Sequence, residues 1–350
     1  MVSLCKNPKI SVILPCQNEE EALSFCLQKA KEVIAKNNLS AEIIVSDSSK
    51  DKSPNIAKNH GVILVKHDKD GYGTAYLEAL KIAKGKYIFM ADADGTYEFS
   101  EIPNFLKLVE QGCDFVIGNR FSGKIEKGAM PYSHKIGNFF LSFVLRLFFG
   151  ASIKDSHCGI RMISRQAINK LDLQTRGMEF ASEMVIKSIK NNFKIKELPV
   201  NYLKRKGKSK LKALPDAWKH MRFMLLYSPM FLFFIPGVLM FLTGALTMIF
   251  SPQNNFLLAS PLLMISGYQL AIFSLFAKTY SVVHLNEKPG FTEKIYKYIT
   301  IETASIIGIV AVLAGIILSQ NNPLLSLTIA TIGVQTVFSS FMLSILGIKK

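Results

Sequence analysis

Sequence signatures of several large enzyme classes are absent from this chain of 350 residues. It contains no GxxxxGK[S/T] phosphate loop, no GxSxG nucleophile elbow and no HExxH zinc motif. The stretch Gly71-Tyr72-Gly73 is too short for the dinucleotide fingerprint GxGxxG. These absences argue against a P-loop nucleotide site, a serine hydrolase and a zinc protease.

Cysteine pairs with a recognisable spacing are also lacking. The chain has five cysteines, none in a CxxC pair or a zinc-ligand pattern: Cys5, Cys16, Cys26, Cys113 and Cys158. This usage predicts free thiols in a reducing compartment. The first fifteen residues lack the apolar core and cleavage site of a signal peptide, so we expect the first domain to be cytosolic.

Positive charge is in excess, with 42 Lys and Arg against 26 Asp and Glu. A net charge of +16 favours a polyanionic partner: nucleic acid, an anionic membrane surface or a phosphorylated substrate. Many of the basic residues lie within 204–222, next to a long apolar region. That position favours membrane headgroups over nucleic acid, although the positive-inside bias alone would explain part of it.

Short apolar runs alternate with amphipathic, helix-length segments through the first half of the chain. We predict strands at 9–14, 41–46, 62–65, 86–91 and 114–117, and helices near 19–36, 51–60, 73–84 and 101–111. Strands separated by helices predict an α/β fold with a mostly parallel sheet. Ligands of such sheets bind beyond the carboxyl ends of the strands.

Four apolar stretches follow, each long enough to cross a bilayer: 230–250, 256–276, 301–319 and 323–347. We therefore divide the chain into an α/β domain over 1–228 and a four-helix transmembrane domain over 229–350. The connections 251–255 and 320–322 carry no charge, whereas 278–300 is rich in lysine. The positive-inside rule then predicts a cytosolic middle loop and cytosolic termini.

Two further segments have the composition of helices at a membrane surface. Residues 134–149 are strongly apolar but contain Lys135 and Arg146, and residues 212–228 follow the basic run. The alternative for 134–149 is an ordinary core helix.

Asp92 and Asp94 follow the apolar run 87–90. In an extended segment, side chains at i and i+2 point to the same side, so the two carboxylates should repel each other. A divalent cation removes this repulsion, and Mg²⁺ and Mn²⁺ prefer such oxygen ligands together with substrate phosphates. The alternative is a helix N-cap followed by a solvated acid.

Seven segments in order resemble the motifs of glycosyltransferase family 2, in the branch that acts on polyprenyl phosphates. They are SVILPCQNEE (11–20), IIVSDSSKD (43–51), GYGTAYLEAL (71–80), ADADGT (91–96), IGNRF (117–121), DSHCGIR (155–161) and PVNYLKRKGKSKL (199–211). The resemblance implies the GT-A fold, a Rossmann-like α/β domain that binds nucleotide sugars.

The resemblance also implies roles for residues at the donor end. Pro15 and Glu19 would line the nucleotide pocket, and Asp47 would bind the base. Asp92 and Asp94 would contact ribose, metal and diphosphate, with Mg²⁺ or Mn²⁺ as the metal. From the residues alone, Pro15 could equally end a strand.

At the acceptor end, the resemblance places Arg120 on a lipid phosphate, with Lys135 nearby. Arg205, with Lys208 and Lys210, would close over the phosphates. Asp94, Arg120 and Arg205 are thus the predicted catalytic residues. A structural ion pair is the alternative for Arg120.

The chain departs from the family pattern in three places: Ser46-Asp47 replaces two acids, Gly95-Thr96 follows the acidic pair, and His134-Lys135 replaces an arginine. Roles for Asp155, Ser156 and Arg161 stay open. Glu179 and Glu183 are four residues apart on a predicted helix, so we expect one of them to face the site.

The resemblance implies transfer of one hexose, with inversion, from a nucleotide diphosphate sugar to a polyprenyl or dolichyl phosphate. GDP-mannose, UDP-glucose and an N-acetylhexosamine donor all stay open. One alternative is a processive polysaccharide synthase, which would carry QxxRW where this chain has AWKHMRF (217–223). The other is a non-catalytic membrane scaffold.

Overall fold

The computed structural model describes residues 7–207, 213–250, 259–284 and 300–347. The chain divides into two compact units, Met1–Met224 and Leu225–Lys350.

The first unit is built on a seven-stranded sheet in the order β3-β2-β1-β4-β6-β5-β7. The strands are β1 (Ile10–Cys16), β2 (Ala41–Asp47), β3 (Ile63–Lys66), β4 (Tyr87–Met90), β5 (Phe115–Asn119), β6 (Arg161–Ser164) and β7 (Ile195–Pro199). Only β6 runs antiparallel to its neighbours, β4 and β5. The mostly parallel α/β sheet expected from the sequence is confirmed.

Two strands were not expected from the sequence. β6 is four residues long and begins with Arg161, and β7 contains Lys196 and Glu197 between its apolar residues. Neither has the continuous apolar run of a buried parallel strand, so both escape a pattern based on hydrophobicity.

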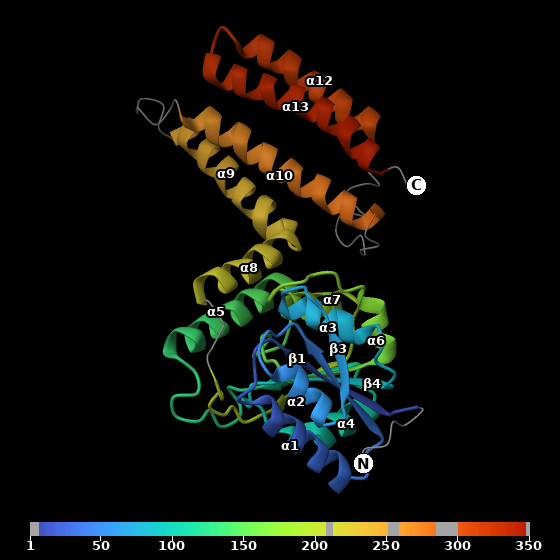
Figure 1. Ribbon diagram of the computed structural model, residues 1–350. Coiled ribbons are helices and arrows are strands. Elements are labelled where there is room, and N and C mark those ends of the chain that lie inside the picture. Colours follow the sequence, from blue (N-terminus) through green and yellow to red (C-terminus); the bar gives the residue numbers. More distant parts are fainter. Residues whose placement is uncertain (1–6, 208–212, 251–258, 285–299, 348–350) are drawn as a thin grey trace. The chain divides into compact units, whose positions relative to one another are not determined.

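Among the described residues, eight α-helices accompany this sheet along the chain. They are α1 (Leu23–Lys36), α2 (Ser53–Asn59), α3 (Tyr72–Leu80), α4 (Ile102–Glu110), α5 (Tyr132–Phe149), α6 (Arg165–Leu171), α7 (Phe180–Lys190) and α8 (Ala213–Leu226). Figure 1 shows α1 and α4 on one face and α3 and α7 on the other. Strands β1, β2 and β4 are therefore buried on both faces, and they hold the loops at their carboxyl ends in fixed positions.

The cysteines that the structure describes are free and buried. Burial raises the pKa values of the Cys16, Cys26 and Cys158 thiols to about 12. These thiols are protonated at neutral pH and are unreactive for that reason. Cys5 lies outside the described residues.

Helix α5 has one buried and one exposed apolar face. Leu141, Val144 and Leu145 are buried, whereas a stripe with helical spacing is exposed: Ile136, Phe139, Phe140, Phe143 and Leu147. An ordinary core helix would bury such a stripe. The exposed stripe instead fits the interfacial helix expected over 134–149.

The second unit contains helices with the length and composition of membrane spans. Four such spans are Met230–Phe250, Ala259–Val283, Ile301–Leu318 and Pro323–Gly347. They correspond to a π-helical turn (Met230–Phe234) with α9 (Ile235–Phe250), and to α10 (Ala259–His284), α12 (Ile301–Leu318) and α13 (Pro323–Gly347). The second span predicted from sequence, 256–276, ended too early because α10 continues past Lys278.

Two helical hairpins in this unit share the same glycine contacts. A Cβ atom on Gly237 of α9 would lie 2.6 Å from the carbonyl oxygen of Gly267 of α10, and one on Gly267 would lie 2.5 Å from that of Gly237. Gly308 of α12 and Gly333 of α13 face each other in the same way, at 2.7 and 2.6 Å. Only glycine allows backbones to approach so closely.

The sequence spacing in the two hairpins matches too. The first helix of each carries G-x6-G (237–244 and 308–315), and the second carries S-x6-G-x-Q (260–269 and 326–335). A Cβ atom on Gly244 would lie 2.8 Å from the Ser260 oxygen, and one on Gly315 would lie 2.8 Å from the Ser326 oxygen. The membrane unit therefore consists of two hairpins built on one repeated packing pattern.

The glycine contacts lead to a stability prediction. Gly333→Ala should lower the thermal denaturation midpoint of the detergent-solubilised chain, because overpacking a close contact costs about 1–3 kcal/mol. Gly347→Ala is the matched control, since nothing lies within 4 Å of a Cβ atom there. Equal midpoints for the two variants would show that the contact does not hold the hairpin.

Candidate active site

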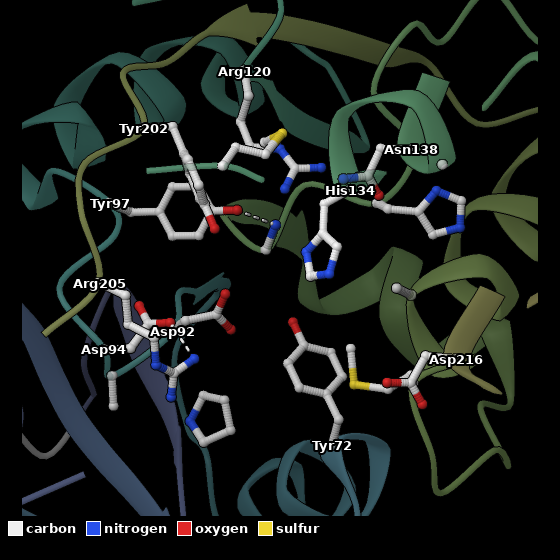
Figure 2. Close-up of a pocket in the computed structure, with 18 of the residues that line it drawn as sticks. Tyr72, Asp92, Asp94, Tyr97, Arg120, His134, Asn138, Tyr202, Arg205 and Asp216 are labelled. Carbon is white, nitrogen blue, oxygen red and sulfur yellow. Dashed lines mark hydrogen bonds and ion pairs between the residues drawn. The ribbon is translucent and has the colours of Figure 1, made fainter. Parts of the chain in front are cut away.

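A cavity of about 600 Å³ lies at the carboxyl edge of the sheet in the first unit. Pro15 at the end of β1, Asp92 and Asp94 after β4, and Arg120 after β5 all line it. Figure 2 shows these acids and arginines, with Tyr72 and His134, around the same space. This edge is where parallel α/β sheets bind ligands.

Asp94 is fixed by the turn that follows β4. The strand ends at Met90, so the acidic pair lies in a turn and not in the extended segment expected from sequence. One oxygen of Asp94, Oδ1, accepts hydrogen bonds from the Thr96 backbone N–H (3.0 Å) and hydroxyl (2.6 Å). Gly95 between them has φ of +78°, which glycine adopts without strain. Gly95-Thr96 thus orients the carboxylate.

Asp92 also lines the cavity, and its ionised form is poorly compensated. Its Oδ2 packs against Gly159, where a Cβ atom would lie only 2.3 Å away. Burial, and then repulsion by Asp94, raise the pKa of Asp92 to about 7 although three arginines oppose the shift. Ionised Asp92 is therefore unfavourable unless a further cation approaches.

Arg205 contacts two other acids of the cavity, Asp94 and Glu19. Its Nη1 donates to Asp94 Oδ2 at 2.9 Å, and its Nη2 forms an ion pair with Glu19. The segment 202–207, which we call the strap, holds Arg205 here. Its Leu203 N–H donates to the Thr96 carbonyl, and its Lys206 N–H donates to the Asp94 carbonyl, both at 2.9 Å. The strap thus lies along the acidic turn.

Arg120 is buried and fixed by Asp155. Its Nε and Nη2 donate to the two Asp155 oxygens at 2.7 Å, and its backbone N–H donates to Oδ2 at 3.0 Å. The structural ion pair considered from sequence is therefore present, but Arg120 also lines the cavity. Two of its five N–H groups are used by this pair, which leaves the guanidinium oriented with further donors.

The loop 155–161 is held by Arg161. Its guanidinium donates to the carbonyls of Cys158, Ser156 and Ala181 at 2.7, 3.0 and 3.0 Å. Asp155 and Arg161, left open by the sequence, thus act on the positions of Arg120 and of the loop that carries Gly159.

Sequence reasoning missed two histidines that line the cavity. His157 Nε2 and His220 Nδ1 both hydrogen-bond the Ser182 hydroxyl, at 3.0 and 2.8 Å. Burial lowers the pKa of His157 well below its usual value and that of His220 to about 4, so both are neutral at pH 7. Their link through Ser182 ties α8 to α7. Because His157 and His220 lie far apart in sequence, no local pattern predicts this link.

The structure does not bring every predicted residue to the cavity. Glu19 and Arg205 line it, but Asp47 is fully buried and does not, and neither of its carboxylate oxygens accepts a hydrogen bond among the described residues. Lys135 is exposed, and its neighbours His134 and Asn138 line the cavity instead. Lys208 and Lys210 lie outside the described residues.

Neither Glu179, at the N-cap of α7, nor Glu183 within the helix lines the cavity, so the expectation that one would is wrong. Glu183 accepts the backbone N–H groups of Gln174 and Thr175 and pairs with Lys187 at 2.7 Å. Glu179 packs against Gly177. Glu183 thus caps the segment before α7.

The donor set of the cavity suits a metal that shares its ligands with a substrate. Among the described residues no group of three His, Cys, Asp or Glu side chains gathers. Asp92 and Asp94 would supply two oxygens, with water and diphosphate supplying the others, which is usual for Mg²⁺ and Mn²⁺. Burial and Asp94 raise the pKa of Asp92, and such an ion would offset this by stabilising the ionised carboxylate.

The first unit has the GT-A fold of glycosyltransferases. A crystal structure of glucosyl-3-phosphoglycerate synthase from Mycobacterium tuberculosis, in complex with Mn²⁺, UDP and glucosyl-3-phosphoglycerate, superposes with a TM-score of 0.52. It covers 63% of this chain and 80% of its own at 19% identity.

Sequence comparison gives the family. Residues 11–172 match the family described as Glycosyl transferase family 2. The low-salt glycan biosynthesis hexosyltransferase Agl6 of Haloferax volcanii is 34% identical over 97% of this chain and 89% of its own length. A dolichyl-phosphate hexose transferase of the same organism is 28% identical over 58% of this chain and 86% of its own. The chain belongs to glycosyltransferase family 2 and is an enzyme of that class.

The contact of Asp92 with Gly159 gives a test of the site. Gly159→Ala should displace the Asp92 carboxylate and lower sugar transfer by about 100-fold, since small misplacements of catalytic groups have effects of this size. The rate with a saturating nucleotide sugar is measured beside the denaturation midpoint. A variant that is as active as the native protein would show that Asp92 does not need its present position.

Proposed function

We propose that this protein transfers one hexose from a nucleotide diphosphate sugar to a polyprenyl phosphate, with inversion and with Mg²⁺ or Mn²⁺. The observation that carries the proposal is the arrangement of one cavity, with the acids Asp92 and Asp94 and the arginines Arg120 and Arg205 on its walls. The acids would bind the cation of a diphosphate, and the arginines would bind the oxygens of the diphosphate and of a second phosphate. The four membrane-length helices bring a lipid acceptor within reach of the protein.

The donor end comprises Pro15, Glu19 and the acidic pair, which all line the cavity. Asp47 belongs to it as the partner of the base. Its buried carboxylate has no hydrogen-bond donor among the described residues, and a nucleotide base presents N–H groups that such oxygens accept. Binding of the base requires the neighbouring wall, which includes Ser48, to open toward Asp47.

The acceptor end comprises Arg120 with His134 and Asn138 of α5. Asp155 orients Arg120, and arginine binds phosphate oxygens with two parallel hydrogen bonds. The exposed apolar stripe of α5 lies on the same helix as His134 and Asn138. An interfacial position for α5 would therefore place the lipid phosphate beside the cavity while its chain stays in the bilayer.

The chemistry needs positioning more than a base. A phosphate monoester carries about −1.5 to −2 charges at pH 7, so its oxygen is already a nucleophile. Arg120 would hold that oxygen in line with the anomeric carbon, and Arg205 would stabilise charge on the leaving diphosphate. When bound, the metal ion supplies further stabilisation of that charge.

We also propose that the catalytic unit and both termini face the cytosol. The loop between α10 and α12 is rich in lysine, and the loops at the other ends of the spans carry no charge. The positive-inside rule favours this orientation. A cytosolic first unit also agrees with a nucleotide-sugar donor.

A direct assay tests the proposed function. Proteoliposomes of the full chain with polyprenyl phosphate are incubated with radiolabelled GDP-mannose, UDP-glucose or UDP-N-acetylglucosamine, and the lipid-linked label is extracted. Asp94→Asn should keep the denaturation midpoint but lower the label at least about 100-fold, because it removes the charge that holds cation and diphosphate. The exposed Asp68→Asn is the matched control. Transfer by Asp94→Asn at the native rate would contradict the role of this acid.

The same assay distinguishes the processive alternative. A single lipid-linked hexose supports the proposal, whereas a water-soluble polymer would favour a polysaccharide synthase. The stretch AWKHMRF (217–223) already lacks the QxxRW pattern of those enzymes. The non-catalytic scaffold is set aside by membership in an enzyme family.

The acceptor end has its own test. Arg120→Lys keeps the charge opposite Asp155 but loses paired hydrogen bonds, each worth about 1.5–3 kcal/mol when charged. The KM for polyprenyl phosphate should rise about tenfold or more, with little change in the KM for the nucleotide sugar. Arg146→Lys, on α5 but outside the cavity lining, is the control. A selective rise in the KM for the donor would move Arg120 to the donor end.

A further inference from the structure

The acid end of the cavity already contains a cation of the protein's own. The Arg205 guanidinium donates to Asp94 Oδ2 at 2.9 Å and pairs with Glu19. Both acids are buried, with exposed fractions of 7% for Asp94 and 9% for Glu19. The other oxygen of Asp94 is occupied by the two bonds from Thr96. The Asp94 oxygen that a metal ion would use is thus the one that Arg205 holds.

The strap leaves the Arg205 side chain able to change partners. Its backbone is anchored on both sides of Arg205, by the N–H groups of Leu203 and Lys206, and the Lys206 ammonium lies 3.4 Å from the centre of the Phe25 ring. The guanidinium, in contrast, is held among the described residues by its ion pairs with Asp94 and Glu19. It can therefore rotate away from Asp94 while the strap stays in place.

Arg205 is also incompletely satisfied in this arrangement. Its Nε is buried, yet it has no hydrogen-bond acceptor among the described residues. A buried donor without an acceptor is unfavourable, and a guanidinium matches two oxygens of a phosphate through adjacent N–H groups. A diphosphate at the acid end would provide the acceptor that is missing.

We propose that Arg205 is the internal counter-ion of the donor site, holding Asp94 and Glu19 when no donor is bound and moving to the diphosphate when metal and donor bind together. This inference rests on the proposed function for the identity of the donor. It predicts that a metal ion alone binds weakly, because it must displace Arg205 from Asp94 while no diphosphate is present to accept the guanidinium. Metal and nucleotide therefore favour each other's binding, by the same factor in both directions.

Direct metal binding tests the exchange without any transfer reaction. Free Mn²⁺ is measured by electron paramagnetic resonance during titration of the detergent-solubilised full chain, alone and with GDP or UDP. Without nucleotide, Arg205→Gln should bind Mn²⁺ about tenfold more tightly than the native protein. With nucleotide, its gain in Mn²⁺ affinity should be several-fold smaller than the native gain, because the coupling of about 5–150-fold that is usual between linked sites is lost.

Two further variants separate the exchange from general effects. Lys204→Gln removes one positive charge from an exposed neighbour and should behave as the native protein. Arg205→Lys keeps the charge but cannot contact both acids as the planar guanidinium does, so its Mn²⁺ affinity should be intermediate. It also provides the comparison if Arg205→Gln is unstable.

The opposite results would overturn the inference. Mn²⁺ affinity without nucleotide that is unchanged or weaker in both Arg205 variants would show that Arg205 does not compete with the metal. An equal increase in Lys204→Gln would reduce the effect to net charge. The titration contains no lipid acceptor. The expected change in Mn²⁺ affinity of Arg205→Gln would therefore be seen even if the chain transferred no hexose to a polyprenyl phosphate, so failure of one proposal can be told from failure of the other.

Discussion

The mutual repulsion of carboxylates at the carboxyl edge of the sheet is the constraint on which the site depends. Asp92, Asp94 and Glu19 all line the cavity at this edge, and burial makes an ionised carboxylate costly. The strap, which is not part of the sheet, offsets this repulsion by placing Arg205 against Asp94 and Glu19. The pKa of Asp92 is raised to about 7 by burial and by Asp94, so a further cation would favour its ionised form.

The second arginine of the cavity has an acidic partner of its own. Arg120 donates two hydrogen bonds to Asp155, which orient its guanidinium where it lines the cavity (Figure 2). Gly159 lets the loop that carries Asp155 approach the Asp92 carboxylate, where a Cβ atom would not fit. The two membrane hairpins repeat one glycine packing pattern, in which close backbone contacts hold the paired helices together.

Much of this could be read from local patterns. The buried parallel strands appear as apolar runs because both of their faces are covered, and the membrane spans appear as long apolar stretches. Asp92, Asp94 and Arg120 were found because ordered motifs mark them. In contrast, β6 and β7 carry charges at positions that a hydrophobic pattern needs to be apolar, and the predicted second span ended at residue 276, just before Lys278, which α10 includes.

By itself, the sequence determined the class of fold, the family motifs and the four spans, since each follows from neighbouring residues or from spacing along one element. Only the tertiary structure decided which side chains share a cavity. His134 lines the cavity where Lys135 was expected, and Asp47 does not line it. Arg205 pairs with Asp94, which is 111 positions away in the chain. The physical reason is that such contacts are set by the packing of distant segments, and no local pattern in the chain encodes the partner of a charge.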